Sequence, residues 1–253
     1  MIFKRNQKAQ PQLARIAVPT INGAEISAVY HGERMGGDFY DFLRVAPHLV
    51  LFGLLDVAGR RQENQPIVAA AQGTFREFGQ SLFSRDDINE SDAMIELSLH
   101  LNHAIMQAAH AVRSCPAFIG CYNEQIGTIC YSNAGHTPAL LRDQAGVTLL
   151  PATGLPLGLF SHVTHDAPTV ALPPGGCLLL VSRGVTEATC DRGEFGFDRV
   201  REDLERARFE TAEQVCGDLL RQLDEFTCRA VTNNDVTALA LLRAQASQAS
   251  VTD

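Results

Sequence analysis

The order of segments along the chain predicts an α+β fold built from layers of strands and helices. Strand-like segments come first, two long helix-like segments follow, and then come strands, two more helices and a last strand. This block order differs from the strict alternation that is typical of a doubly wound parallel sheet. The 253 residues, 45% of them hydrophobic, suffice for a large core, and neither an internal repeat nor a clear linker divides them. We therefore expect a single domain over residues 13–243.

The first half of the chain supplies three strands and two helices. Three segments are strand-like and are separated by Gly and Pro turn signals: residues 24–30, 38–45 and 48–57. The third is almost wholly apolar, as expected of a strand that is covered on both faces. Residues 66–83 repeat small or apolar side chains at close to the helical spacing, and residues 89–92 offer N-cap side chains for a helix that ends near residue 112.

The second half returns to strands and ends with a helix pair and one more strand. Strands are expected at residues 116–122, 127–133, 139–142, 147–150, 163–172, 177–182 and 235–242, with a Pro- and Gly-rich loop at 153–158. Helices fit residues 197–206 and 211–230. Residues 1–12 are polar and lack periodicity, so we expect a flexible arm there. Residues 244–253 are small and polar, which predicts a disordered tail.

Charge and cysteine content restrict the class of protein. The formal net charge of -8 argues against a nucleic-acid binder that relies on a basic field, and it gives no attraction toward an anionic membrane. The basic start of the chain has no apolar segment behind it, and the longest apolar run, residues 49–55, is too short to span a bilayer. The seven cysteines, with no Cys-x-x-Cys, are typical of reduced, mostly buried thiols. These features predict a cytoplasmic protein; they leave its oligomeric state open.

Two carboxylates stand where an apolar strand meets glycines. Asp38 follows a Gly-Gly pair, and Asp56 ends the apolar strand. An ionised aspartate at the end of such a strand is costly unless it is paired, hydrogen-bonded or bound to a metal. The two side chains could converge on a hard divalent cation, which prefers oxygen ligands. Equally, each could be a turn or cap residue that ends its strand.

Seven segments of the chain resemble the metal-dependent (PPM-type) serine/threonine phosphatases, in the bacterial SpoIIE/RsbU-like branch. In family order and spacing they are GGDFYDF (36–42), LLDVAG (54–59), YSNAGHTPALL (131–141), TGLPLG (153–158), LLLVSRGVTEA (178–188), GEFGFDRV (193–200) and NDVTALALLR (234–243). The resemblance implies a four-layer α-β-β-α sandwich, with two antiparallel sheets flanked by helix pairs. It also implies a two-metal Mn²⁺ or Mg²⁺ centre, whose activated water attacks a phosphoserine or phosphothreonine.

The ligand positions that the resemblance implies are only partly kept. Asp56 matches the aspartate that bridges both metals, Val57 matches the residue that lends a backbone carbonyl, and Asp38 matches a catalytic-site aspartate. The two later ligand positions, which are aspartates in the family, are Arg183 and Asn234 here. Arginine stays protonated and cannot bind a hard cation, so the site is three charge units less negative than four carboxylates would make it.

This loss predicts a degraded metal centre. The main hypothesis is that the Arg183 guanidinium takes the place of the metal and bridges Asp56 and Asp38 through its fork. Asp235 could rescue the lost ligand, but a shift of one residue along a strand points its side chain to the other face. A single ion held by Asp56, the Val57 carbonyl and Asp38 is the alternative. In that case Mn²⁺ or Mg²⁺ is the cofactor; otherwise there is none.

Other polar residues carry weaker signals. Arg60 and Arg61 stand where the family has His-Gly and could grip a phosphate, although arginines at a turn are usually just solvated. His136 fits a structural hydrogen-bonding role better than that of a catalytic base. Glu187 could pair with the arginine four residues earlier if that turn is helical. Histidines at 100, 103, 110, 162 and 165 lack the further ligands that a zinc site needs.

Two functions remain open at this point. The first is a regulatory binder, or pseudophosphatase, that recognises a phosphorylated regulatory protein without hydrolysing it. The second is an active Mn- or Mg-dependent protein-serine/threonine phosphatase, a hydrolase with a reduced metal centre. In either case the resemblance implies bacterial partner switching, with a phosphorylated anti-sigma-factor antagonist as the partner. A weaker third reading is an effector domain that is detached from its sensor.

Overall fold

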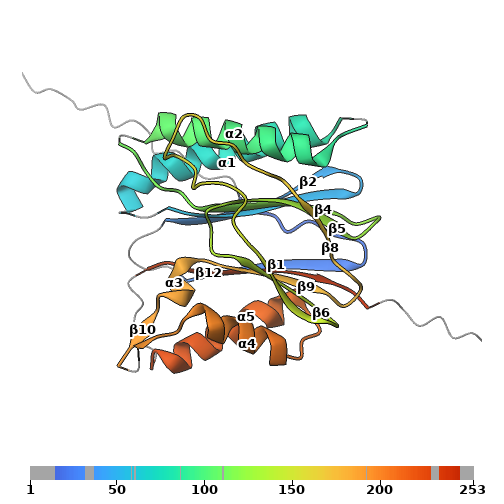
Figure 1. The fold of residues 1–253 in the computed structure, drawn as a ribbon, viewed down its shortest axis with the longest axis vertical. Coiled ribbons are helices and arrows are strands. Elements are labelled where there is room, and N and C mark those ends of the chain that lie inside the picture. The colour runs from blue at the N-terminus through green and yellow to red at the C-terminus, as the bar shows by residue number, and fades with distance from the viewer. Residues whose placement is uncertain are drawn as a thin grey trace, which may run out of the picture.

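Two five-stranded antiparallel sheets lie face to face in a computed structural model of the chain (Figure 1). The structure describes residues 15–31, 37–57, 59, 61–85, 87–109, 111–191, 193–228 and 234–245. One sheet has the order β2 (Asp38–Ala46), β3 (Leu49–Asp56), β4 (Ala117–Asn123), β5 (Thr128–Ala134) and β8 (Thr169–Ala171). The other has the order β1 (Ala24–His31), β12 (Val236–Arg243), β9 (Cys177–Val181), β6 (Ala139–Asp143) and β7 (Gly146–Leu150).

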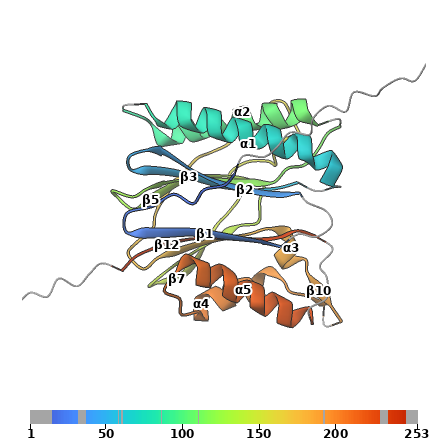
Figure 2. The same ribbon diagram turned by 180° about the vertical axis from the view of Figure 1, so that it is seen from behind.

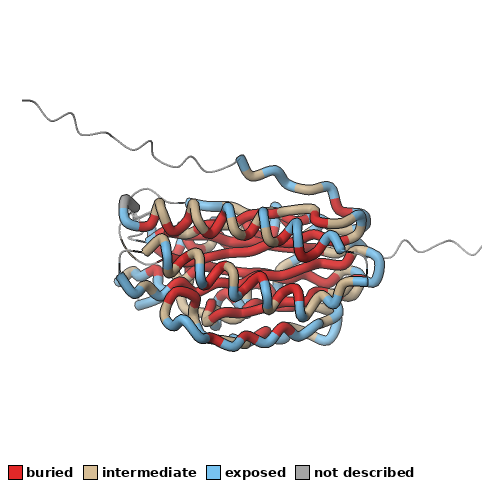
Figure 3. The backbone as a smooth tube through the Cα atoms, turned by 90° about the horizontal axis from the view of Figure 1, so that it is seen from above, coloured by how far each residue is buried: buried red, intermediate tan, exposed pale blue. Residues whose placement is uncertain are grey.

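A helix pair covers the outer face of each sheet, so the described chain has the predicted α-β-β-α layers. Helices α1 (Arg61–Phe83) and α2 (Glu90–Ala108) lie on the first sheet, and α4 (Phe197–Arg206) and α5 (Ala212–Phe226) lie on the second (Figures 1 and 2). Buried residues, red in Figure 3, run along the strands that are seen beneath the helices nearest the viewer. None of the helices among the described residues combines the length and apolarity that a membrane crossing requires.

Strand β3 is apolar in every residue but its last, because it is buried on both faces. All eight of its residues are buried, as its composition predicts. Val50, Phe52 and Leu54 face the core between the two sheets. Leu51 and Leu55, on the opposite face, pack under α1 and α2. The strand therefore packs against a hydrophobic core on each of its two faces. Its last residue, Asp56, is thereby held in place at the end of the sandwich.

Local signals set the helix ends, with some corrections to the predicted bounds. Asn89 caps α2 by accepting hydrogen bonds from two backbone amides, and Thr211 caps α5 through its hydroxyl. Helix α1 begins five residues earlier than predicted and contains Pro66, whose ring removes only one helical hydrogen bond near the start. Helix α2 ends at Ala108 rather than near residue 112, and α5 ends at Phe226 rather than residue 230.

The strand predicted over residues 163–172 is mostly a loop. Only Thr169–Ala171 pairs with β5; earlier in the segment, Asp166 donates its backbone N–H to the carbonyl of Thr153 across the loop. Three short elements escaped prediction, because two to four residues show no periodicity: α3 (Arg183–Thr186), β10 (Thr189–Cys190) and β11 (Gly193–Glu194).

The predicted terminal segments lie largely outside the described residues. The arm at 1–12 is one of them, and so are residues 246–253 of the predicted tail. Ala244, which we placed in the tail, instead donates its backbone N–H to the Gly23 carbonyl. All seven cysteines are described as free thiols, and five of them are buried, which agrees with the expectation of mostly buried thiols.

Candidate functional site

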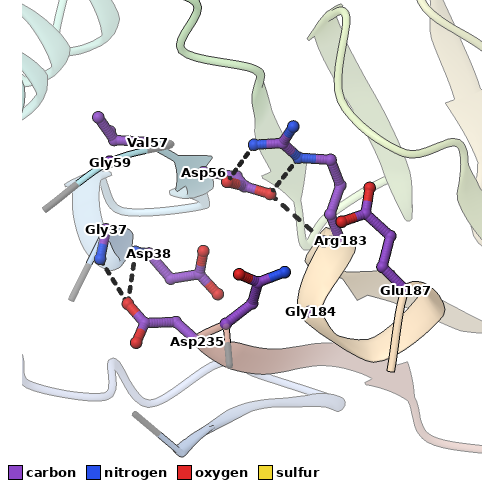
Figure 4. A pocket seen from close by; sticks show the side chains of 10 residues that line it. Gly37, Asp38, Asp56, Val57, Gly59, Arg183, Gly184, Glu187 and Asp235 are labelled. Carbon is purple, nitrogen blue, oxygen red and sulfur yellow. Dashed lines mark hydrogen bonds and ion pairs between the residues drawn. The ribbon is translucent and has the colours of Figure 1, made fainter. Parts of the chain in front are cut away.

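The predicted acidic residues line one pocket at the end of the sandwich. Asp38 and Asp56 lie directly opposite each other in the register of β2 and β3. The pocket has a volume of about 190 Å³ and is lined by Gly37, Asp38, Asp56, Val57, Gly59, Arg183, Gly184, Glu187, Asn234 and Asp235 (Figure 4). The structure thus brings together both kept aspartates and both substituted positions. Their ligand roles stay predictions.

Two glycines let the backbone segments of the pocket approach one another. A Cβ on Gly37 would lie 1.9 Å from the Val57 carbonyl oxygen, and one on Gly184 would lie 1.8 Å from the Asp235 carbonyl oxygen. Any side chain at either position would clash with rigid backbone rather than with a movable group. The glycines therefore fix how closely the ends of β2, β3, α3 and β12 come together around the pocket.

Arg183 holds both carboxylate oxygens of Asp56. Its Nε donates to Oδ2 and its Nη2 donates to Oδ1, each at 2.9 Å, and its backbone N–H lies 3.3 Å from Oδ2. Figure 4 shows one edge of the guanidinium facing the two oxygens of the carboxylate. Burial alone would raise the pKa of Asp56, but the hydrogen bond and charge of Arg183 outweigh it and hold the pKa below its usual value. The pair is therefore ionised and bidentate at neutral pH.

The predicted bridge from Arg183 to Asp38 is not formed, and this corrects our main hypothesis. Both hydrogen-bonded donors of the fork go to Asp56, while Asp38 Oδ2 accepts from the Thr237 hydroxyl at 2.6 Å. Burial raises the pKa of Asp38 to about 7, with further contributions from the charges of Asp56 and Asp235. Hydrogen bonds from the Ser182 and Thr237 hydroxyls oppose this rise only partly. Geometry explains the outcome, because a planar fork matches one carboxylate best.

Asp235 lies in the same pocket as Asp38, contrary to the expectation that it points to the other face. Its Oδ2 accepts from the backbone N–H groups of Gly37 and Asp38, the latter at 3.1 Å. The alternation argument fails because β12 begins only at Val236, so the pleat does not fix the direction of the preceding residue. Asn234 also lines the pocket, as predicted for its position.

The Val57 carbonyl, the predicted backbone ligand, already accepts a hydrogen bond. Its donor is Nδ2 of Asn64 in the first turns of α1, at 2.9 Å, and the Asn64 side chain is fully buried. Sequence reasoning missed this residue, because one polar side chain early in a helix gives no specific signal. It also missed Ser182 and Thr237, although both stand inside the family-like segments and could have been found by asking which hydroxyls flank the ligand positions.

The remaining candidates are placed only in part. Arg60 lies outside the described residues, and of Arg61 only the backbone, at the start of α1, is described. Their phosphate-binding role stays a prediction. His136 is buried, and its ring Nδ1 lies 3.0 Å from the Thr137 carbonyl, a contact of the structural kind expected; burial lowers its pKa. Glu187 donates its backbone N–H to the Arg183 carbonyl, so the turn between them is helical as supposed.

Among the described residues, the other histidines do not gather into a metal site. His100 stacks on Phe78, with ring centroids 3.7 Å apart, and His103 lies 2.7 Å from the side-chain amide of Gln107. His165 is buried, whereas His162 is exposed. His110 lies outside the described residues.

The oxygen atoms that would have to bind metal ions in the pocket do not fit the two-metal centre that the resemblance implies. Both oxygens of Asp56 are taken by a guanidinium, the Val57 carbonyl by an amide, and one oxygen of Asp235 by backbone N–H groups. Within the described part of the chain, no group of three or more His, Cys, Asp and Glu side chains is arranged to hold a metal ion. A hard divalent cation needs several free oxygen ligands at once, which this hydrogen-bond pattern does not offer.

The sequence matches known phosphatases over most of its length. It matches the family model described as Stage II sporulation protein E (SpoIIE) over residues 47–244. It is 29% identical to the phosphoserine phosphatase RsbP of Bacillus subtilis over 74% of this chain and 47% of that protein. It is 24% identical to the phosphoserine phosphatase RsbU of the same organism over 92% of this chain and 68% of that protein. The chain thus spans about half of RsbP and about two thirds of RsbU.

Solved structures confirm the fold. The RsbU and RsbW domains of Rv1364c from Mycobacterium tuberculosis superpose with a TM-score of 0.73 at 22% identity, covering 91% of this chain and 63% of that one. The PP2C phosphatase domain of SpoIIE from Bacillus subtilis, with a fragment of its regulatory domain, gives 0.72 at 13% identity over 88% and 64%. RsbX, solved in complex with magnesium, gives 0.62 at 15% identity over 90% and 99%. These likenesses show that the chain has the fold of the PP2C phosphatase domains. The family match over residues 47–244 shows that the chain belongs to the SpoIIE family.

Proposed function

We propose that this chain is a pseudophosphatase of bacterial phospho-Ser/Thr signalling, a regulatory domain that binds a phosphorylated protein without two-metal hydrolysis. The observation that carries the proposal is the bidentate pair between Arg183 and Asp56. Asp56 is the residue that the family uses to bridge its two metals. Here a guanidinium occupies both of its oxygens, at the position where the family has a further carboxylate ligand.

Electrostatics supports this proposal. The guanidinium is a permanent positive charge, and the Asp56 carboxylate on which it lies is only 9% exposed. A divalent cation would have to displace Arg183 from Asp56 and then remain beside it, at a cost of like-charge repulsion in a partly buried site. Two-metal hydrolysis needs both the neutralisation of phosphoryl charge and a deprotonated water, and each depends on the ions.

The partner we propose is a phosphorylated regulatory protein that resembles an anti-sigma-factor antagonist, in a cytoplasmic partner-switching system. Support comes from relatives that carry the name phosphoserine phosphatase and match most of this chain in sequence. A domain with the phosphatase fold that does not hydrolyse phosphate would still bind the phosphoprotein through its substrate-facing surface. Arg60 and Arg61 are our candidates for contacts to its phosphate.

A second candidate function is an active phosphatase with a reduced centre and one Mn²⁺ or Mg²⁺ ion. Four carboxylates line the pocket, and burial with carboxylate repulsion raises the pKa of Asp38 to about 7. A cation beside Asp38 would relieve that repulsion. The pocket therefore keeps some attraction for a single ion, held by Asp38, Asp56 and the Val57 carbonyl.

Calorimetry and turnover separate the two candidates. The chain would be titrated with Mn²⁺ and assayed on p-nitrophenyl phosphate and on a phosphoserine-bearing anti-sigma-factor antagonist, with Asp56→Asn as the matched control. We expect turnover of the wild-type chain no faster than that of the control, and tighter binding of the phosphorylated than of the unphosphorylated antagonist. Mn²⁺-dependent turnover that the control abolishes would support the active phosphatase and overturn the proposal.

A further inference from the structure

The Asn64 side chain lies in a confined place beside the pocket. It stands in the first turns of α1 with none of its surface exposed, and its Nδ2 donates to the Val57 carbonyl oxygen at 2.9 Å. The same Nδ2 would lie 2.9 Å from a Cβ on Gly37, so the amide is wedged between the ends of β2 and β3. The helix that follows β3 thus sends a hydrogen-bond donor back to the carbonyl just after the end of that strand.

The Asn64 amide has one orientation that makes a hydrogen bond. Its Oδ1 is buried and has no hydrogen-bond partner among the described residues. Exchanging the two ends of the amide would place Oδ1 against the Val57 oxygen, and two acceptors would then face each other. Full burial prevents the side chain from turning to water instead. The bond to Val57 is therefore the interaction that sets the direction of this side chain, and the positive end of the amide points at the carbonyl.

We infer that Asn64 is a second internal substitute for a cation, which excludes a metal ion from the Val57 carbonyl just as Arg183 excludes one from Asp56. This inference rests on the proposed loss of two-metal hydrolysis, because it explains how the second ligand position is closed. A divalent ion bound to that oxygen would have to share it with the positive end of a fixed amide dipole. The Arg183 guanidinium, which is charged, and the Asn64 amide, which is neutral, then occupy the Asp56 oxygens and the Val57 carbonyl oxygen that would otherwise attract ions.

The inference makes a prediction about restoring the site. Changing Arg183→Asp together with Asn234→Asp returns the two family carboxylates, yet the Val57 carbonyl stays bonded to Asn64. That double variant is expected to bind one Mn²⁺ ion. Adding Asn64→Ala frees the carbonyl, so a second Mn²⁺ ion is then expected to bind. Its dissociation constant in the triple variant should be at least tenfold lower than in the double variant, which corresponds to about 1.4 kcal/mol.

The experiment counts Mn²⁺ ions by electron paramagnetic resonance, in the double variant with and without Asn64→Ala. Asn102→Ala in the same background is the matched control. Asn102 is also a buried helical asparagine, and its Nδ2 donates to a loop carbonyl, that of Phe160, at 2.9 Å. A melting curve for each variant without metal reports the general cost of losing such a bond. The Asn102→Ala control should lower the melting temperature without adding an ion.

The outcomes distinguish this inference from the proposed function. A second ion that appears with Asn64→Ala and is absent with Asn102→Ala supports the inference. Two ions in the double variant before Asn64 is changed would overturn it, and so would weaker Mn²⁺ binding after the change, because Asn64 would then be a ligand through Oδ1. A triple variant that still binds one ion would also overturn it. Mn²⁺-dependent turnover by the wild-type chain would instead overturn the proposed function, and it is measured separately.

Discussion

Removing the Arg183 side chain should destabilise the protein, because Asp56 is then left nearly buried without its partner. Breaking a fully buried ion pair from one side costs about 3–5 kcal/mol. Here Asp56 is 9% exposed but Arg183 is 40% exposed, so water screens part of the charge. We therefore expect Arg183→Ala to lower the free energy of unfolding by about 2 kcal/mol, measured by urea denaturation at neutral pH with a chelator present.

A double-mutant cycle isolates the pair. Asp56→Asn removes the charge that needs Arg183, so Arg183→Ala in that background should cost much less than in the wild-type chain. Arg206→Ala is the matched control: Arg206 pairs with Glu202 at 3.1 Å, but its side chain is 75% exposed. That control should change the free energy of unfolding by no more than about 0.5 kcal/mol. A cost for Arg183→Ala as small as the control's, or strict additivity in the cycle, would refute the reasoning.

Three other changes test further parts of the pocket. The pKa of Asp38 is about 7 in the folded chain, well above the ordinary value of 3.8, so the folded state keeps a proton that the unfolded state loses. The free energy of unfolding should therefore fall as the pH rises from about 4 to 7. Asp38→Asn should reduce that fall by up to about 4 kcal/mol, as measured by urea denaturation at several pH values across this range. Gly184→Ala should cost about 1–3 kcal/mol, because its Cβ would lie 1.8 Å from a backbone oxygen, whereas Gly217→Ala in α5, with open space around it, should be neutral or stabilising. Arg183→Asp with Asn234→Asp should create Mn²⁺ binding detectable by calorimetry, and no gain would contradict our assignment of the lost ligands.

The fold could be predicted well from the sequence, because its main signals are strong and local. Local sequence alone predicts three of these features: the apolar run of β3, the N-cap at Asn89 and the helical spacing in α1. The pairing of two sheets came from the family resemblance rather than from periodicity. Element ends were predicted less well: we placed the start of α1 at Pro66, but the helix begins five residues earlier.

The membership of the pocket was predicted better than its hydrogen bonds. Asp38, Asp56, Arg183 and Asn234 all line it, as their motifs indicate. The sequence could not show that Arg183 grips Asp56 alone, since that choice depends on angles at the end of β3 and the start of α3. Nor could it show the Asn64 bond, which depends on how α1 leaves the strand.

Asp235 shows where reasoning by alternation fails. The rule that neighbouring residues point to opposite faces holds inside a strand, but this residue lies just before β12. Its carboxylate turns toward the backbone N–H groups of Gly37 and Asp38, which need an acceptor at the start of β2. Such end effects depend on tertiary contacts and leave no trace in the local pattern.

The central claim is that Arg183 occupies the place of a metal on Asp56. A crystal structure grown in excess Mn²⁺, with anomalous diffraction recorded at the manganese edge, tests it most directly. We predict that the guanidinium stays on both oxygens of Asp56 and that no anomalous peak lies between Asp38 and Asp56. Two manganese peaks beside Asp56, with Arg183 turned away from it, would contradict the account.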